Sequence, residues 1–149
     1  YNTDYIGFKE SLEEWLDEKP KSALILGTGG ASKAVKKALE DLGIPFQSVS
    51  RSASSDTLSY ETLHAQPELL EENPLIINCT PLGTFPKTDS MPDIPVAYLS
   101  SKNLVYDLVY NPNITKLMQA CLDKGGKAKN GLEMLERQAE AAWKIWNSK

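Results

Sequence analysis

The residues of this chain best suited to chemistry are the glycines between Leu24 and Leu39. Gly27 and Gly29 occupy the first two positions of the pattern G-x-G-x-x-G, and Ser32 occupies the third. In that pattern one glycine permits a tight turn, and the next lets backbone N–H groups approach a pyrophosphate at a helix N-terminus. An ordinary strand-to-helix turn is the alternative, but an apolar strand and a helical periodicity flank this turn. We therefore predict that it binds a nucleotide.

A second candidate is Arg51, in the sequence Ser50-Arg51-Ser52 that ends the next predicted strand. NAD-binding proteins usually carry Asp or Glu at this tip, where the carboxylate holds the ribose 2′-OH. A guanidinium suits the 2′-phosphate of NADP instead, because its planar fork can bind two phosphate oxygens. A solvated loop arginine is the other interpretation, and the position at the strand tip favours the phosphate.

The remaining reactive residues have ordinary interpretations. His64, the single histidine, has no accompanying carboxylate or nucleophile motif, which favours a surface position over a catalytic base. Cys79 and Cys121 lie in apolar patterns without His or Cys at ligand spacing, so we expect small buried hydrophobes and no metal site or disulfide. Asp4 stands at the start of a predicted helix, and composition alone favours a helix cap.

The composition limits the partners of the chain. Its 149 residues carry 16 Lys and Arg against 20 Asp and Glu, and its longest basic run is Lys36-Lys37. Nucleic acid and anionic membranes are therefore poor partners. No apolar run approaches the roughly 20 residues needed to cross a bilayer, and the first residues resemble no targeting peptide, so we expect a cytoplasmic protein. Because the sequence lacks an initiating Met, we expect it to start inside a longer protein.

The elements that position the candidates alternate along the chain. The periodicities predict helices from a cap at Thr3 or Asp4 to Lys19-Pro20, from the glycine turn to Leu42, over 114–124, and from Leu132 onward. Strands are expected at 22–27, 46–50, 75–79, 103–109 and 127–129, with a long loop over 84–95. This order predicts an α/β fold of Rossmann type, a doubly wound, mostly parallel sheet with helices on both faces. All the candidate turns follow strands, and that carboxyl edge binds ligands in such sheets.

Two of the predicted helices are amphipathic. The first carries Phe8, Leu12, Trp15 and Leu16 on one face, and the last carries Leu132, Leu135, Ala139, Ala142 and Trp146 on one face.

Five segments together resemble shikimate dehydrogenase, an NADP-dependent enzyme of aromatic amino acid (chorismate) biosynthesis. Each motif alone is weak or moderate, but their order and spacing across nearly the whole chain are specific. The segments are Asn2-Thr3-Asp4-Tyr5-Ile6-Gly7-Phe8, Gly27-Thr28-Gly29-Gly30-Ala31-Ser32, Ser50-Arg51-Ser52, Asn78-Cys79-Thr80-Pro81-Leu82-Gly83, and Asp107 to Pro112 with Gly131-Leu132-Glu133-Met134-Leu135 and Gln138-Ala139.

The resemblance implies roles for individual residues. Asp4 would be the carboxylate of a Lys/Asp catalytic pair and contact the substrate, Gln138 would hydrogen-bond the substrate, and Tyr110 would lie near an inter-domain cleft. For Gln138 a polar helix position is the alternative, and for Tyr110 ring packing beside Pro112. The residues implied to contact NADP are Gly27, Thr28, Gly29, Gly30, Ala31, Ser50, Arg51, Ser52, Thr80, Val109 and Gly131.

The chain departs from the family in two ways. Nothing in it matches the catalytic lysine and carboxylate-binding serines of the family's substrate domain. The resemblance therefore implies that on the order of 100 residues, one small domain, are missing. We therefore expect residues 1–20 to form an inter-domain spacer helix and 21–149 an NADP-binding domain whose last helix returns toward the missing domain. The second departure is the lack of a further basic residue directly after Arg51. We therefore expect NADP preference to depend on Arg51, with Lys33 as a second contributor.

This implies a domain of an enzyme that reduces 3-dehydroshikimate to shikimate, with the chain itself binding NADP without turnover. Two alternatives stay open. An NAD-preferring quinate/shikimate dehydrogenase would normally show an acid near Arg51, and Asp56 lies too far along the loop. A non-catalytic NADP-sensing module would need no substrate domain. A methyltransferase that uses S-adenosylmethionine is disfavoured, because it too needs an acid where Arg51 stands.

Overall fold

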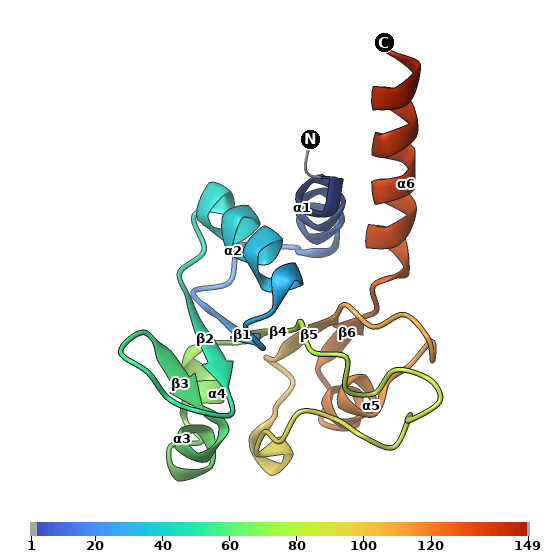
Figure 1. Cartoon of the computed structure of the whole chain (residues 1–149). Coiled ribbons are helices and arrows are strands. Elements are labelled where there is room, and N and C mark those ends of the chain that lie inside the picture. Colours follow the sequence, from blue (N-terminus) through green and yellow to red (C-terminus); the bar gives the residue numbers. More distant parts are fainter. Residues whose placement is uncertain (1–2, 149) are drawn as a thin grey trace.

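Six short strands form the centre of the fold, a sheet in the order β3-β2-β1-β4-β5-β6 (Figure 1). The structure is a computed structural model, and it describes residues 3–148. All ladders between the strands are parallel, which confirms the predicted Rossmann-type sheet and makes it parallel throughout. The strands are β1 (Ala23–Leu26), β2 (Phe46–Ser50), β3 (Thr57–Ser59), β4 (Leu75–Asn78), β5 (Leu104–Asp107) and β6 (Lys127–Lys129).

Helices cover both faces of the sheet, as predicted. Along β1 the side chains alternate: Ala23 and Ile25 pack under one set of helices, and Leu24 and Leu26 under the other. Figure 1 shows α1, α2 and α6 on one side of the sheet and α3, α4 and α5 on the other. The helices are α1 (Thr3–Trp15), α2 (Gly30–Leu42), α3 (Tyr60–Ala65), α4 (Leu69–Glu72), α5 (Lys116–Asp123) and α6 (Leu132–Asn147), with a 3₁₀ turn at Val96–Tyr98. Among residues 3–148, no helix has the length and apolar character to span a membrane.

The strand order fixes where ligands can bind. From β1 the chain moves to β2 on one side, and then returns to place β4 on the other side. In a doubly wound sheet the crevice at this reversal, outside the carboxyl ends of the strands, is the ligand site. The turns after β1, β2, β4 and β5 therefore meet at one edge.

Helices α1 and α6 cross closely at Gly7. A Cβ atom at Gly7 would lie 2.6 Å from the carbonyl oxygen of Met134 and 3.0 Å from Cγ of Gln138. Arg137 of α6 forms ion pairs with Glu133 of its own helix and with Glu10 and Glu14 of α1. The absence of a side chain at Gly7 thus lets the two helices share hydrogen-bonding and charged contacts along their length.

The predicted apolar face of α6 is exposed in this chain. Leu132 and Leu135 are partly exposed, and Trp146 is 73% exposed. The helix instead buries Met134 and packs against α1, and its second half extends away from the sheet (Figure 1). The sequence pattern located the helix correctly, but this apolar face does not contribute to the core of the described residues.

Several element boundaries differ from prediction. Helix α1 ends at Trp15 and not near Pro20, because Asp17 and Glu18 would place negative charge at the negative end of the helix dipole. Asp17 instead pairs with Lys127 at 2.9 Å. The expected cap at Thr3 or Asp4 is wrong, since both already lie within α1, while Asn2 lies outside the described residues.

The remaining differences have local causes. Helix α5 begins after Thr115, and not at 114, because the Thr115 side chain accepts a hydrogen bond from the Met118 N–H as the N-cap. Strand β3 and helices α3 and α4 were not predicted, because each is short and the stretch from 53 to 73 is polar, without a clear apolar periodicity.

Candidate functional site

The glycine turn leaves β1 in a conformation that requires glycine. Gly27 has φ +101°, and a Cβ atom there would lie 2.9 Å from Cγ2 of Thr80. Gly29 is the N-cap of α2, and within the described chain no side chain caps this helix end. Ser32 is buried and donates its hydroxyl hydrogen bond to the Gly29 carbonyl at 2.6 Å. The Gly27 N–H donates to the Val49 carbonyl at 2.8 Å and the Ser32 N–H to the Gly29 carbonyl at 3.1 Å. Among the described residues, the amides of the turn that remain for a ligand are those of residues 28–31.

The space above the turn fits an anionic group. A Cβ atom built on Gly29 or Gly30 would meet no atom of the described chain within 4 Å. Backbone N–H groups and the positive end of the α2 dipole face this space, which is the arrangement that binds phosphate. Thr28 and Ala31 flank the two glycines in the same turn. The residues present thus fit the pyrophosphate of a dinucleotide.

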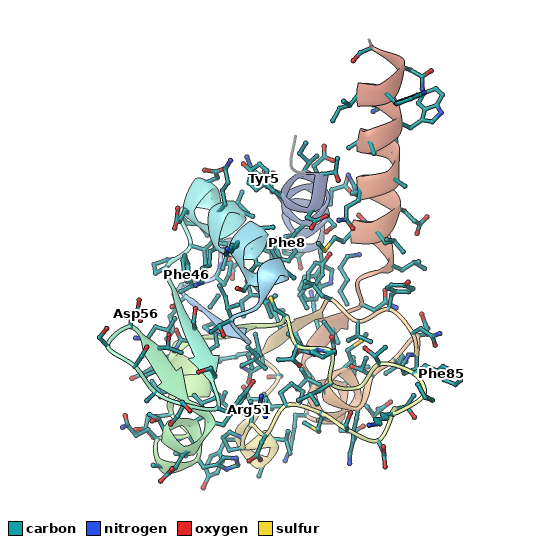
Figure 2. The ribbon with its side chains drawn as sticks, in the orientation of Figure 1. Tyr5, Phe8, Phe46, Arg51, Asp56 and Phe85 are labelled. Atoms are coloured by element: carbon teal, nitrogen blue, oxygen red, sulfur yellow. The ribbon has the colours of Figure 1, made fainter. Side chains whose placement is uncertain are left out.

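The tip of β2 presents Arg51 to solvent. The Ser50 hydroxyl donates to the Ser52 carbonyl at 2.7 Å, which closes a small turn around Arg51. Arg51 forms no ion pair with any carboxylate in residues 3–148. Burial raises the pKa of the nearby Tyr60, and the positive charge of Arg51 acts in the opposite direction. Figure 2 shows Arg51 at the opposite end of β2 from Phe46, with Asp56 further along the loop. Asp56 instead accepts a hydrogen bond from Ser54 at 3.1 Å, so it does not neutralise the guanidinium.

A cavity lies between the glycine turn and the turns that follow β4 and β5. Its volume is about 410 Å³. Ala31, Thr80, Val109 and Tyr110, all sequence-predicted site residues, line it together. Its other lining residues are Cys79, Pro81, Thr84, Leu108 and Asn111. Arg51, Asp4 and Gln138 are not part of this lining, so the structure divides the predicted site into three places.

A buried polar network supports this cavity, and the sequence interpretation assigned it no role. Asp107 at the end of β5 is fully buried and accepts hydrogen bonds from the Asn78 side-chain amide at 3.0 Å, the Val109 N–H at 3.0 Å and the Thr115 hydroxyl at 2.7 Å. Burial raises the pKa of Asp107, and these three hydrogen bonds act in the opposite direction. Asn78 in turn accepts from the N–H and the hydroxyl of Thr80, at 2.9 and 2.7 Å. The network therefore joins the turns after β4 and β5.

Gly131 holds the start of α6 against the turn after β5. Its N–H donates to the Val109 carbonyl at 3.2 Å, and a Cβ atom there would lie only 2.0 Å from the Leu108 carbonyl oxygen. Only glycine fits this close approach. Gly131 and Val109, both predicted to contact the cofactor, are thus neighbours at the edge of the cavity.

Asp4 and Gln138, separated by 134 residues in the chain, are in contact. The Gln138 amide donates a hydrogen bond to the Asp4 carboxylate across the α1–α6 interface. Both side chains are accessible to solvent. The resemblance implied that both contact one substrate, and the structure brings them together at the end of α1.

The other residues considered from the sequence lie apart from these groups. Burial raises the pKa of the Cys79 thiol to about 12 and that of the Cys121 thiol to about 11, so both are poor nucleophiles. Both cysteines are free. His64 is largely exposed and contacts Asp93 at 3.0 Å. Residues 3–148 contain no group of three His, Cys, Asp or Glu that could hold a metal ion.

The fold and the site define a Rossmann-type α/β domain with an open glycine turn at the N-terminus of α2, at the carboxyl edge of the sheet. No family model matches the chain. Over 98% of its length it is 36% identical to the NADP-dependent shikimate dehydrogenase of Caldicellulosiruptor saccharolyticus. The chain is a homologue of part of the shikimate dehydrogenases, and it spans about 57% of the length of this relative.

Solved structures agree with this homology. A chorismate mutase/shikimate 5-dehydrogenase fusion protein from Clostridium acetobutylicum matches with a TM-score of 0.82 at 35% identity, over 99% of this chain and 54% of that one. A shikimate dehydrogenase in complex with NADP+ matches with a TM-score of 0.83 at 29% identity, over 100% of this chain and 57% of that one.

Proposed function

We propose that this chain is the NADP(H)-binding domain of a shikimate dehydrogenase, an enzyme that reversibly reduces 3-dehydroshikimate to shikimate. The observation that carries the proposal is the guanidinium of Arg51 at the tip of β2, which forms no ion pair within residues 3–148, next to the strand that leads into the open glycine turn of α2. The cofactor would supply a hydride at its nicotinamide ring. The residues of the chain would bind and orient it.

Each predicted cofactor residue has a position that suits this role. Gly27, Thr28, Gly29, Gly30 and Ala31 would hold the pyrophosphate at the N-terminus of α2. Ser50, Arg51 and Ser52 would hold the 2′-phosphate of the adenosine half, with the guanidinium as the charged ligand. Because β2 lies on one side of β1 and β4 on the other, the nicotinamide half would extend to the cavity lined by Thr80 and Val109, beside Gly131.

The substrate side would be shared with a second domain. Asp4 would act with a lysine of that domain on the proton of the substrate hydroxyl, Gln138 would hydrogen-bond the substrate, and Tyr110 would line the cleft. Residues 1–20 would be the inter-domain spacer, and 21–149 the cofactor domain. The exposed apolar face of α6 supports this organisation, since a helix that returns toward a second domain would be covered there. The cytoplasmic location expected from the sequence stays a prediction.

Calorimetric titration with NADPH and with NADH tests the proposal. We expect NADPH to bind at least tenfold more tightly, a difference of about 1.4 kcal/mol. Arg51→Gln should reduce NADPH affinity by a similar factor or more and leave NADH affinity nearly unchanged, because only NADPH carries the 2′-phosphate. Lys21→Gln, at an exposed lysine just before β1 and so at the opposite edge of the sheet, is the control for loss of one positive charge.

The alternatives give different results. Tighter binding of NADH would favour an NAD-preferring quinate/shikimate dehydrogenase, and absence of binding for both cofactors would contradict the assignment of the glycine turn. If the chain binds NADPH but its gene encodes no substrate domain upstream, the result would favour a sensing module.

A further inference from the structure

We propose that Asp107 is a positioning residue that shapes the nicotinamide side of the cofactor site by fixing the turns after β4 and β5. This inference rests on the proposed function. Asp107 does not line the cavity itself. It accepts a hydrogen bond from Val109, and Asn78 accepts one from Thr80, and both Val109 and Thr80 line the cavity.

The ionised carboxylate of Asp107 acts only as a hydrogen-bond acceptor. Both oxygens of Asp107 accept hydrogen bonds, Oδ1 from Asn78 Nδ2 and Val109 N, and Oδ2 from Thr115 Oγ1. An ionised carboxylate can only accept, so it selects the orientation of the Asn78 side chain that points the NH₂ group toward it. The Asn78 carbonyl oxygen must then point away from Asp107.

The orientation of Asn78 decides the shape of the next turn. Its carbonyl oxygen accepts from both the N–H and the hydroxyl of Thr80, and the Thr80 hydroxyl oxygen accepts from the Leu82 N–H at 3.3 Å. The same Thr80 packs against Gly27, where Cγ2 lies 2.9 Å from an ideal Cβ position. If the Asn78 amide were reversed, its NH₂ group would face Thr80 in place of its carbonyl oxygen. The N–H and the hydroxyl of Thr80 would then both lose their acceptor.

Asp107 acts on the second turn directly. Its Oδ1 holds the Val109 N–H, and the Val109 carbonyl accepts from Gly131 at the start of α6. Its Oδ2 fixes Thr115, which caps α5 through the Met118 N–H. One carboxylate therefore orders two turns and one helix start, all at the carboxyl edge of β4 and β5.

The test separates the two halves of the cofactor. Adenosine 2′,5′-bisphosphate carries the adenosine half with its phosphates, and it has no atoms that could reach the turns after β4 and β5. We expect Asp107→Asn to weaken NADPH binding at least tenfold and to change the affinity for adenosine 2′,5′-bisphosphate less than twofold, both measured by calorimetry on the 149-residue chain. A merely structural role would weaken both ligands equally, and that result, or unchanged NADPH affinity, would overturn the inference.

Two further variants make the test complete. Tyr106→Phe is the control on the same strand: it removes the buried 2.6 Å hydrogen bond to Ser11 on the opposite face, and should leave both affinities unchanged. If Asp107→Asn does not fold, Thr115→Val replaces it, with the same selective loss expected and recovery in Thr115→Ser. A Thr115→Val variant without selective loss would overturn the inference. Wild-type chain that binds neither ligand would overturn the proposed function, and this inference with it.

Discussion

Glycines at the ligand edge serve different physical purposes that the sequence pattern does not distinguish. Gly27 and Gly131 are required because of what surrounds them: a positive φ and the Thr80 side chain at one, and the Leu108 carbonyl at the other. Gly29 and Gly30 both lie outside the positive-φ region and have free space around them, so a side chain at either position would not clash with the rest of the chain. Their glycine character matters for what binds above them.

Paired alanine variants separate these two purposes. Gly131→Ala should lower the free energy of unfolding by about 1–3 kcal/mol, because the Cβ atom would meet the Leu108 backbone at 2.0 Å. Gly30→Ala, at the start of a helix with open space around it, should keep or raise stability by up to ~1 kcal/mol and weaken NADPH binding. Urea unfolding and calorimetry measure the two effects. A stable Gly131→Ala variant, or undiminished NADPH affinity in Gly30→Ala, would contradict this division.

At the scale of elements, the α1–α6 pair is the part of the fold that brings distant site residues together. Asp4 and Gln138 come from opposite ends of the chain and meet because the two helices cross at Gly7. The contact is held by Arg137 between carboxylates of both helices, and by Tyr106, which packs against Phe8 and Trp15 of α1. The geometry of the proposed catalytic carboxylate thus depends on helix packing.

Gly7→Ala tests this dependence. Replacing an ordinary exposed glycine in a helix by alanine raises the free energy of unfolding by ~1 kcal/mol. Here the added methyl group would lie 2.6 Å from the Met134 carbonyl, so we expect a loss of about 1–3 kcal/mol in the free energy of unfolding. Chemical denaturation measures the sign directly, and a stabilised Gly7→Ala variant would show that α1 and α6 have room to separate at no cost.

Glu133 should give this interface a dependence on pH. Hydrogen bonds from Lys129 and Arg137 hold the pKa of Glu133 below its ordinary value of 4.5. A depressed folded pKa means that the ionised form stabilises the fold above pH 4.5, and that this stabilisation is lost as the pH falls through the folded pKa. The side chain is partly exposed, so the effect is about 1 kcal/mol or less. Wild type and Glu133→Gln should differ most near neutral pH and converge in acid; a difference that grows in acid would contradict this.

At the scale of the whole molecule, cofactor binding and catalysis should be separable. The described residues contain a complete sheet with both faces covered, so the chain has the core of a folding unit. They hold one carboxylate of the proposed catalytic pair, Asp4. In the proposed reaction, turnover would also need a lysine held across the cleft in the right geometry.

The isolated chain should therefore be stabilised by cofactor without turning over substrate. NADPH at 100 times its dissociation constant should raise the free energy of unfolding by about 2.7 kcal/mol, and NADH at the same concentration by less. Thermal unfolding with each cofactor measures this. Absorbance at the NADPH band with 3-dehydroshikimate should not change, and a measurable rate would refute the need for a second domain.

The sequence predicted those parts of the fold that arise from local patterns. The apolar runs of β1, β2 and β4, the glycine turn, and the end of α2 at Gly43 were all correct within a residue or two. The contact between Asp4 and Gln138 is not visible in any local pattern, because it depends on how α1 and α6 cross. The positioning role proposed for Asp107 was also missed, although one signal was present: an acidic residue at the end of an apolar strand is costly to bury without partners.

The exposed end of α6 makes the chain suited to fluorescence spectroscopy. Of its three tryptophans, Trp143 and Trp146 are 65% and 73% exposed on the last turns of α6, whereas Trp15 is half-buried with its ring 6.0 Å from that of Tyr106. Iodide should quench the two indoles of α6 strongly and that of α1 weakly. Light emitted at the red end of the tryptophan spectrum therefore reports on the free end of α6, and light at the blue end reports on the packing beneath α1.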